Sequence, residues 1–204
     1  NYVLFQLKEN SSVIALQSNY SNKLYVYVNN VSYNVAVTVA NNEWHNIMLV
    51  FDGTGSGNAD RLKLYFNGSN ITGGTYSGTV PTAVGTFTSS MTSDIGRTPA
   101  TAYFDGELSN VQIFNTALSL ADVETLYNNG SPIRTLASIP QNSSLKAWYK
   151  LDASEIYDSS NTQWQIANNV LSDKAYSFDG TNNIEIAQNS SIQTSTFSVG
   201  LWIK

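Results

Sequence analysis

Apolar and polar residues alternate along most of the chain. In the segment 23–28, the three aliphatic side chains fall on one face of an extended strand, while Tyr25 and Tyr27 fall on the other. This pattern is typical of a strand with one buried face. Similar alternation predicts strands over 2–7, 13–17, 23–28, 33–39, 45–51, 62–66, 104–114, 146–151, 175–178, 183–186 and 197–203.

Turn-forming pairs of residues separate these segments at short intervals. They include Asn29-Asn30, Asn67-Gly68 and Asp179-Gly180, and these residue types reverse the chain direction readily. Many short strands at such a spacing are typical of a sandwich of two sheets. We therefore expect an all-β protein in which two antiparallel sheets pack face to face.

One helix is expected, near residues 119–129. Ser119 and Asp122 have the spacing of a capping box, and Gly130 followed by Pro132 favours a stop. Between these signals, apolar residues recur at helical spacing and predict one packed face, formed by Leu120, Val123, Leu126 and Tyr127.

Composition narrows the classes of partner. The 204 residues are 42% hydrophobic, which is enough for the core of one sandwich. Only 12% are charged, about half of the usual share, and the net charge is -5 without any cluster of Lys or Arg, so we expect no nucleic-acid partner. Apolar runs are only strand-length, so we expect no membrane insertion. The absence of cysteine excludes disulfides and thiolate metal sites and favours a microbial or viral source.

Two segments carry a family resemblance. Segment 43–53 reads EWHNIMLVFDG and is followed at 62–68 by LKLYFNG; segment 104–119 reads FDGELSNVQIFNTALS. Together they resemble the core and the closing strand of laminin-G-like and pentraxin-like jelly rolls of the concanavalin A type. The resemblance implies a two-sheet jelly-roll sandwich.

A third segment resembles the opening strands of the same kind of domain. It comprises 145–152, 176–180 and 197–204. It therefore follows the closing strand instead of preceding it, as in a circularly shifted frame. We expect 1–132 to form the last two-thirds of a jelly roll, 133–144 a linker, and 145–204 the first third of one.

This order leaves two organisations open. The chain is either a repeat cut from a tandem array, which we favour, or a closed circular permutant. In the closed case Asn1 and Lys204 should lie near one another. In the array case the partners are neighbouring copies of the same protein, in a head-to-tail array or filament.

Catalytic residues are not indicated. Jelly-roll glucanases carry an acid and a nucleophile at alternating positions of one strand, and no such run of carboxylates occurs here. Glu185 stands alone, while Asp105 and Glu107 belong to the closing-strand motif. His45 is the only histidine and follows Trp44 at the start of a strand, which favours a structural role. We expect a non-enzymatic protein.

One loop is a candidate calcium site. Oxygen-bearing side chains recur at alternate positions with glycines between them, as in loops that wrap one calcium ion: Asp52, Thr54, Ser56, Asn58 and Asp60. Lys63 stands where a calcium loop would carry a distal glutamate, and a glycine-rich hairpin explains the same residues. The resemblance to pentraxins does not extend to their calcium chemistry, because 95–100 lacks the acids. No other cofactor is indicated.

Tyrosines supply a candidate carbohydrate site. Tyr20, Tyr25, Tyr27 and Tyr33 cluster in the sequence, and exposed tyrosine rings are platforms on which sugar rings stack. Strand aromatics also simply cover sheet faces. We expect a surface module, extracellular, at the cell surface or on a virion, that acts as a structural repeat of a fibre, appendage or adhesin. The alternative is a lectin that binds cell-surface glycans, with or without calcium.

Overall fold

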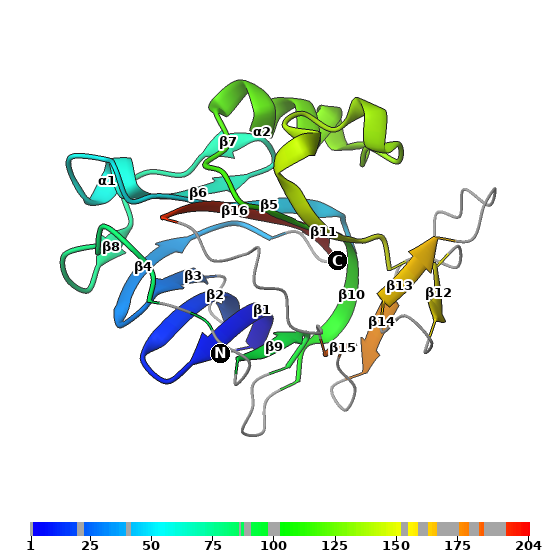
Figure 1. Ribbon diagram of the computed structural model, residues 1–204, viewed down its shortest axis with the longest axis horizontal. Coiled ribbons are helices and arrows are strands. Elements are labelled where there is room, and N and C mark those ends of the chain that lie inside the picture. The colour runs from blue at the N-terminus through cyan, green and yellow to red at the C-terminus, as the bar shows by residue number, and fades with distance from the viewer. Residues whose placement is uncertain are drawn as a thin grey trace.

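The computed structural model describes residues 2–19, 23–39, 42–85, 87, 91–97, 103–151, 155–158, 163–166, 176–179, 184–185 and 195–204. Within these residues two antiparallel sheets stack on one another, and a helix covers the outer side of one of them (Figure 1). The all-β sandwich expected from the alternation of residues is confirmed, as is the jelly roll that the resembling segments implied.

Sheet A contains the strands nearest the N-terminus. Its strand order is β15 (Ile184–Glu185), β9 (Thr92–Ile95), β1 (Tyr2–Glu9), β2 (Ser12–Asn19), β3 (Lys23–Val28), β4 (Val31–Ala36) and β8 (Thr75–Tyr76). The turns between β1 and β2 and between β3 and β4 place Asn10 and Asn29 at positive φ, a conformation that asparagine tolerates well. Consecutive strands therefore pair as simple hairpins.

Sheet B combines strands from both parts of the chain. Its order is β11 (Leu145–Tyr149), β10 (Asp105–Phe114), β16 (Thr196–Ile203), β5 (His45–Asp52), β6 (Leu62–Phe66) and β7 (Ser69–Asn70), and β14 (Tyr176–Asp179) also pairs with β10. Strands β12 (Glu155–Asp158) and β13 (Gln163–Ile166) pair only with each other among the described strands.

The hydrophobic core lies between the two sheets. On sheet A, Leu7, Ile14 and Val28 are paired in register across β1, β2 and β3, and all three are buried. Sheet B contributes the inward positions of β5 and β16, where Phe51 and Phe197 lie with ring centroids 5.1 Å apart. Burial of a side chain of this size stabilises the fold by about 1.5–3 kcal/mol, so the alternating strands supply the main driving force.

A second, smaller cluster covers the outer side of sheet B. The helix α2 (Leu120–Tyr127) packs there with Val123 and Leu126 against Met48 of β5, and Ile139 from the following segment joins them. The capping box is present, because Ser119 and Asp122 exchange side-chain to backbone hydrogen bonds. The expected helix is thus confirmed. One part of the prediction was wrong: Leu120 was expected on the packed face of the helix, but it is 49% exposed.

Segment 131–144 lies between the two parts of the chain without a long strand or helix. It contains two short 3-10 turns, η2 (Leu136–Ser138) and η3 (Asn142–Ser144), and its Ile139 is only 3% exposed. It leads into β11, which pairs with β10 of the same chain. The domain boundaries at 132 and 144 stay a prediction, and Asn1, expected near Lys204 in a closed domain, lies outside the described residues.

A tight junction at the end of β5 gives the first testable prediction. Gly53 donates its backbone N–H to Ser195 O at 3.1 Å, and a Cβ at this position would lie 1.8 Å from Thr82 O. Because that obstacle is backbone, Gly53→Ala should lower the free energy of unfolding by more than about 2 kcal/mol. Urea unfolding would measure the change.

The matched control is Gly57→Ala. A Cβ on Gly57 would meet its nearest neighbour, an Asp60 oxygen, at 3.9 Å, which is ordinary contact. This variant should change stability by less than about 1 kcal/mol. Equal losses in the two variants would show that the junction around Gly53 is not a tight one.

Candidate functional site: the outer face of sheet A

Two tyrosine rings lie side by side on the outer face of sheet A. Tyr25 and Tyr27 are successive outward residues of β3, and both are partly exposed. Their ring centroids are 6.4 Å apart and their planes differ by 14°. The Tyr25 hydroxyl accepts a hydrogen bond from Asn19 Nδ2 at 3.3 Å, which helps to fix the ring. The two rings are therefore adjacent and nearly parallel on this face.

Uncharged side chains flank this tyrosine pair on the neighbouring strands. Gln17 of β2 and Asn34 of β4 pair in register with Tyr25. Ala15 and Ser32 occupy the corresponding positions on either side of Tyr27. Directly opposed residues of neighbouring strands have their side chains on the same face, so amides and a hydroxyl border the two rings. The sequence alone did not predict these flanking residues, because only the pairing register of β2, β3 and β4 shows which residues lie beside the tyrosines.

The other predicted tyrosines do not extend this surface. Tyr33 lies on the inner side of sheet A, is only 3% exposed and stacks on Tyr76 with centroids 4.5 Å apart. Its hydroxyl donates to Ile71 O at 2.9 Å and accepts from Gly74 N at 3.2 Å. The structure therefore makes Tyr33 a core residue that holds the 71–74 loop, and we remove it from the candidate site. Tyr20 lies outside the described residues.

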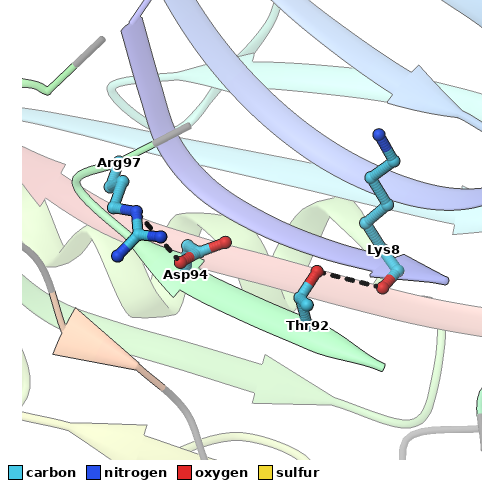
Figure 2. Close-up of polar contacts among 4 residues, drawn as sticks. All are labelled: Lys8, Thr92, Asp94 and Arg97. Atoms are coloured by element: carbon cyan, nitrogen blue, oxygen red, sulfur yellow. Dashed lines mark hydrogen bonds and ion pairs between the residues drawn. The ribbon is translucent and has the colours of Figure 1, made fainter. Parts of the chain in front are cut away.

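Polar residues also gather at the β1–β9 end of the outer face (Figure 2). Arg97 Nε lies 4.0 Å from Asp94 Oδ1, and the Thr92 hydroxyl donates to Lys8 O at 3.2 Å. Asp94 pairs in register with Gln6, and the two residues are 4% and 6% exposed. Gln6 Nε2 has no hydrogen-bond partner within the described part of the chain. Gln6 and Asp94 are thus closed to solvent, whereas Lys8 and Thr92 at the same end are exposed.

The candidate calcium residues form three local groups instead of one. Asp52 accepts hydrogen bonds from the N–H and the hydroxyl of Thr54, at 3.0 and 2.6 Å. Ser56 donates to Asp60 at 2.6 Å, and this bond lowers the pKa of Asp60. Asn58 turns away toward the backbone of residues 78 and 80. Among the described residues no group of three or more His, Cys, Asp or Glu side chains could hold a metal, and calcium binding here stays a prediction.

Two of the remaining titratable residues considered for catalysis, His45 and Glu107, are engaged in contacts within the fold. His45 is 5% exposed, stacks on Phe66 and lies with Nδ1 3.2 Å from Asn67 Nδ2. Glu107 forms an ion pair with Lys204 at 3.3 Å. Asp105 is exposed at the start of β10, and the backbone of Glu185 pairs in register with Asp94.

Two small hollows lie elsewhere on the described surface. One of about 160 Å³ opens at the end of the sandwich between Lys23, Phe104 and Lys204. The other, of about 100 Å³, lies under the 71–74 loop beside Tyr33 and Tyr76. Both are too small to enclose a drug-sized ligand, since pockets for such ligands measure about 300–1,000 Å³. Among the surfaces formed by the described residues, the outer face of sheet A is therefore a broader candidate than either hollow.

Comparison with known proteins agrees with this architecture. Residues 2–124 match a family model described as the concanavalin A-like lectin/glucanases superfamily. The chain therefore belongs to this superfamily, as the two resembling segments implied. Its members include carbohydrate-binding and structural modules as well as glucanases. Neither the curated proteins nor the solved structures yielded a match. Among the described residues, no helix is long and apolar enough to cross a membrane.

The buried hydroxyl of Tyr33 gives a second testable prediction. Tyr33→Phe removes one donor and one acceptor that hold the 71–74 loop. Because the Ile71 carbonyl and the Gly74 N–H would then lack their partner, the free energy of unfolding should fall by about 1–3 kcal/mol. Tyr25→Phe is the control: its partly exposed hydroxyl has water as an alternative partner, so its loss should stay below about 0.5 kcal/mol. Denaturant unfolding that ranked the two variants in the opposite order would contradict the role of Tyr33.

The phenol of Tyr76 gives a prediction about alkaline pH. Burial, followed by the proximity of Tyr33 and Asp60, raises the pKa of Tyr76 to about 12. An unfolded tyrosine has a pKa of about 10, so the protonated phenol contributes stability that is complete below about pH 10 and is lost as the pH rises toward 12. The free energy of unfolding of the native protein should fall across that range.

The control for this pH dependence is Tyr76→Phe, which has no group to titrate. The variant also loses the hydrogen bond from the Tyr76 hydroxyl to Leu62 O, so it should be less stable at neutral pH. Its stability should nevertheless fall less steeply than that of the native protein between about pH 10 and 12. Parallel curves for the two proteins would show that Tyr76 titrates normally.

Proposed function

We propose that this chain is a non-enzymatic carbohydrate-binding module of an extracellular, cell-surface or virion protein, and that sugar rings stack on Tyr25 and Tyr27. The observation that carries the proposal is the nearly parallel, partly exposed pair of rings on the outer face of sheet A. Aromatic faces attract the C–H groups of sugars, and the bordering amides and hydroxyl match sugar hydroxyl groups. Membership of a superfamily that contains lectins supports the same function.

Hydrolysis is not part of the proposal. A glycosidase needs two carboxyl groups about 5–10 Å apart on either side of the sugar bond. The residues that border the tyrosine pair in register are Ala15, Gln17, Ser32 and Asn34, none of which is an acid. Asp94 lies on β9, which is separated from the tyrosine-bearing strand β3 by β1 and β2, and it is buried beside Arg97.

A glycan array, probed with and without a chelator, tests the proposal. We expect the native protein to bind at least one class of glycan, and Tyr27→Ala to weaken that binding about tenfold or more, since the platform loses one of its two rings. If glycan binding is lost when the chelator is present, calcium takes part in binding. The Asp52–Asp60 loop is then the candidate calcium site.

The control for this prediction is Tyr27→Phe. It keeps the ring and should retain most of the affinity if stacking is the main contribution. If Tyr27→Ala binds glycans as tightly as the native protein, the tyrosine pair is not the binding site. Circular dichroism of each variant would establish that it is folded.

A second candidate function is structural. Strands β11 and β16, which come last in the sequence, occupy sheet B together with strands from residues 45–114. In a fibre or surface array, neighbouring copies could supply the same pairings to one another. If no glycan binds with or without calcium, we favour this structural function, with neighbouring copies as the partners.

A further inference from the structure

We infer that the ligand of the tyrosine pair is an uncharged glycan of at least two sugar units, whose chain runs along strand β3 and not across the sheet. This inference rests on the proposed function and specifies its ligand. The arrangement of the described side chains on the outer face of β2, β3 and β4 carries it.

The direction of the glycan follows from the positions of the two rings. Tyr25 and Tyr27 are two residues apart on one strand, a distance of about 6.7 Å along a strand, which agrees with the 6.4 Å between their centroids. Each ring can therefore support a separate sugar unit. The planes differ by only 14°, so two sugar units stacked on the two rings would lie nearly parallel to one another.

The neighbouring strands do not continue the aromatic surface. Gln17 and Asn34 flank Tyr25, and Ala15 and Ser32 flank Tyr27. A glycan that crossed the sheet would therefore leave its aromatic contact after one unit. A glycan along β3 keeps stacking, and its hydroxyl groups reach amide and hydroxyl partners on both sides. Asn34 Nδ2 donates to Thr75 O at 3.2 Å, which helps to hold the Asn34 amide in position.

The absence of charge on the four residues that flank the rings favours a neutral sugar. The four flanking residues are neutral, and the next outward residue along β3 is Lys23 at the beginning of the strand. Lys23 also lines the hollow at the end of the sandwich. The residues that flank the rings on β2 and β4 offer an acidic sugar no guanidinium or ammonium group, whereas a neutral sugar leaves no charge unpaired there.

Isothermal titration of the full chain with defined oligosaccharides tests the inference. The probes are linear neutral oligomers of glucose, mannose, galactose and N-acetylglucosamine, from single sugars to tetrasaccharides, with oligogalacturonic acids as the acidic series. We expect a neutral disaccharide to bind about tenfold or more tightly than its single sugar, with little further gain for longer oligomers. Affinity should change by less than about twofold between low and high salt, because no ion pair is formed.

Three variants separate the possible results. Tyr25→Ala and Tyr27→Ala should each reduce the affinity for the disaccharide to that for the single sugar, and Lys23→Gln should leave it unchanged. A single sugar that binds as tightly as the disaccharide would overturn the two-unit platform. Tighter binding of oligogalacturonic acids, lost at high salt and in Lys23→Gln, would overturn the neutral class.

A different set of results would contradict the proposed function itself. In that case none of the oligosaccharides binds, or binding persists unchanged when either tyrosine is replaced. A length-independent or salt-sensitive affinity that still requires both tyrosines would leave the proposed function in place and reject only the inference about its ligand.

Discussion

The burial of strand β16 is the interaction on which the rest of the structure depends. β5 and β10 are each paired with β16 and not with one another, so the middle of sheet B exists only when this strand is in place. Its inward side chains, including Phe197 and Leu201, belong to the main core. On its outer side, the Ser198 hydroxyl donates to Thr116 O and accepts from Leu118 N, both at 2.9 Å. One strand thus fixes the core and the segment that leads into α2.

Much of the fold could be predicted because strand alternation and helix capping are local properties. The inward residues of β3 and the capping box of Ser119 are both fixed by spacing along the chain. Leu120 shows where this reasoning ends. It has the periodicity of the buried helix face, yet the cluster that covers sheet B includes Val123 and Leu126 and not Leu120. Periodicity defines a face, but only tertiary packing determines how much of it is covered.

The candidate site was predictable in part for the same reason. Alternation places Tyr25 and Tyr27 opposite the aliphatic residues of β3, and the structure agrees. Tyr33 was misplaced because its side depends on how β4 pairs with β3: the turn at Asn29 and Asn30 sets Tyr33 opposite Val26, an inward residue. The flanking amides depend on the same register. Asn58 turns away from the other loop oxygens because it begins the short helix α1 (Asn58–Arg61), which the sequence did not indicate.

The short strands at the sheet edges have a consequence for solubility. An exposed strand edge offers unpaired N–H and C=O groups that can add another chain, and long flat edges promote aggregation. Sheet A ends on one side in β8, of two residues, and sheet B ends on one side in β7, also of two residues. With a small net charge and few charged residues, the chain has little electrostatic repulsion to keep copies apart. Edges too short to template a new strand provide that protection by geometry.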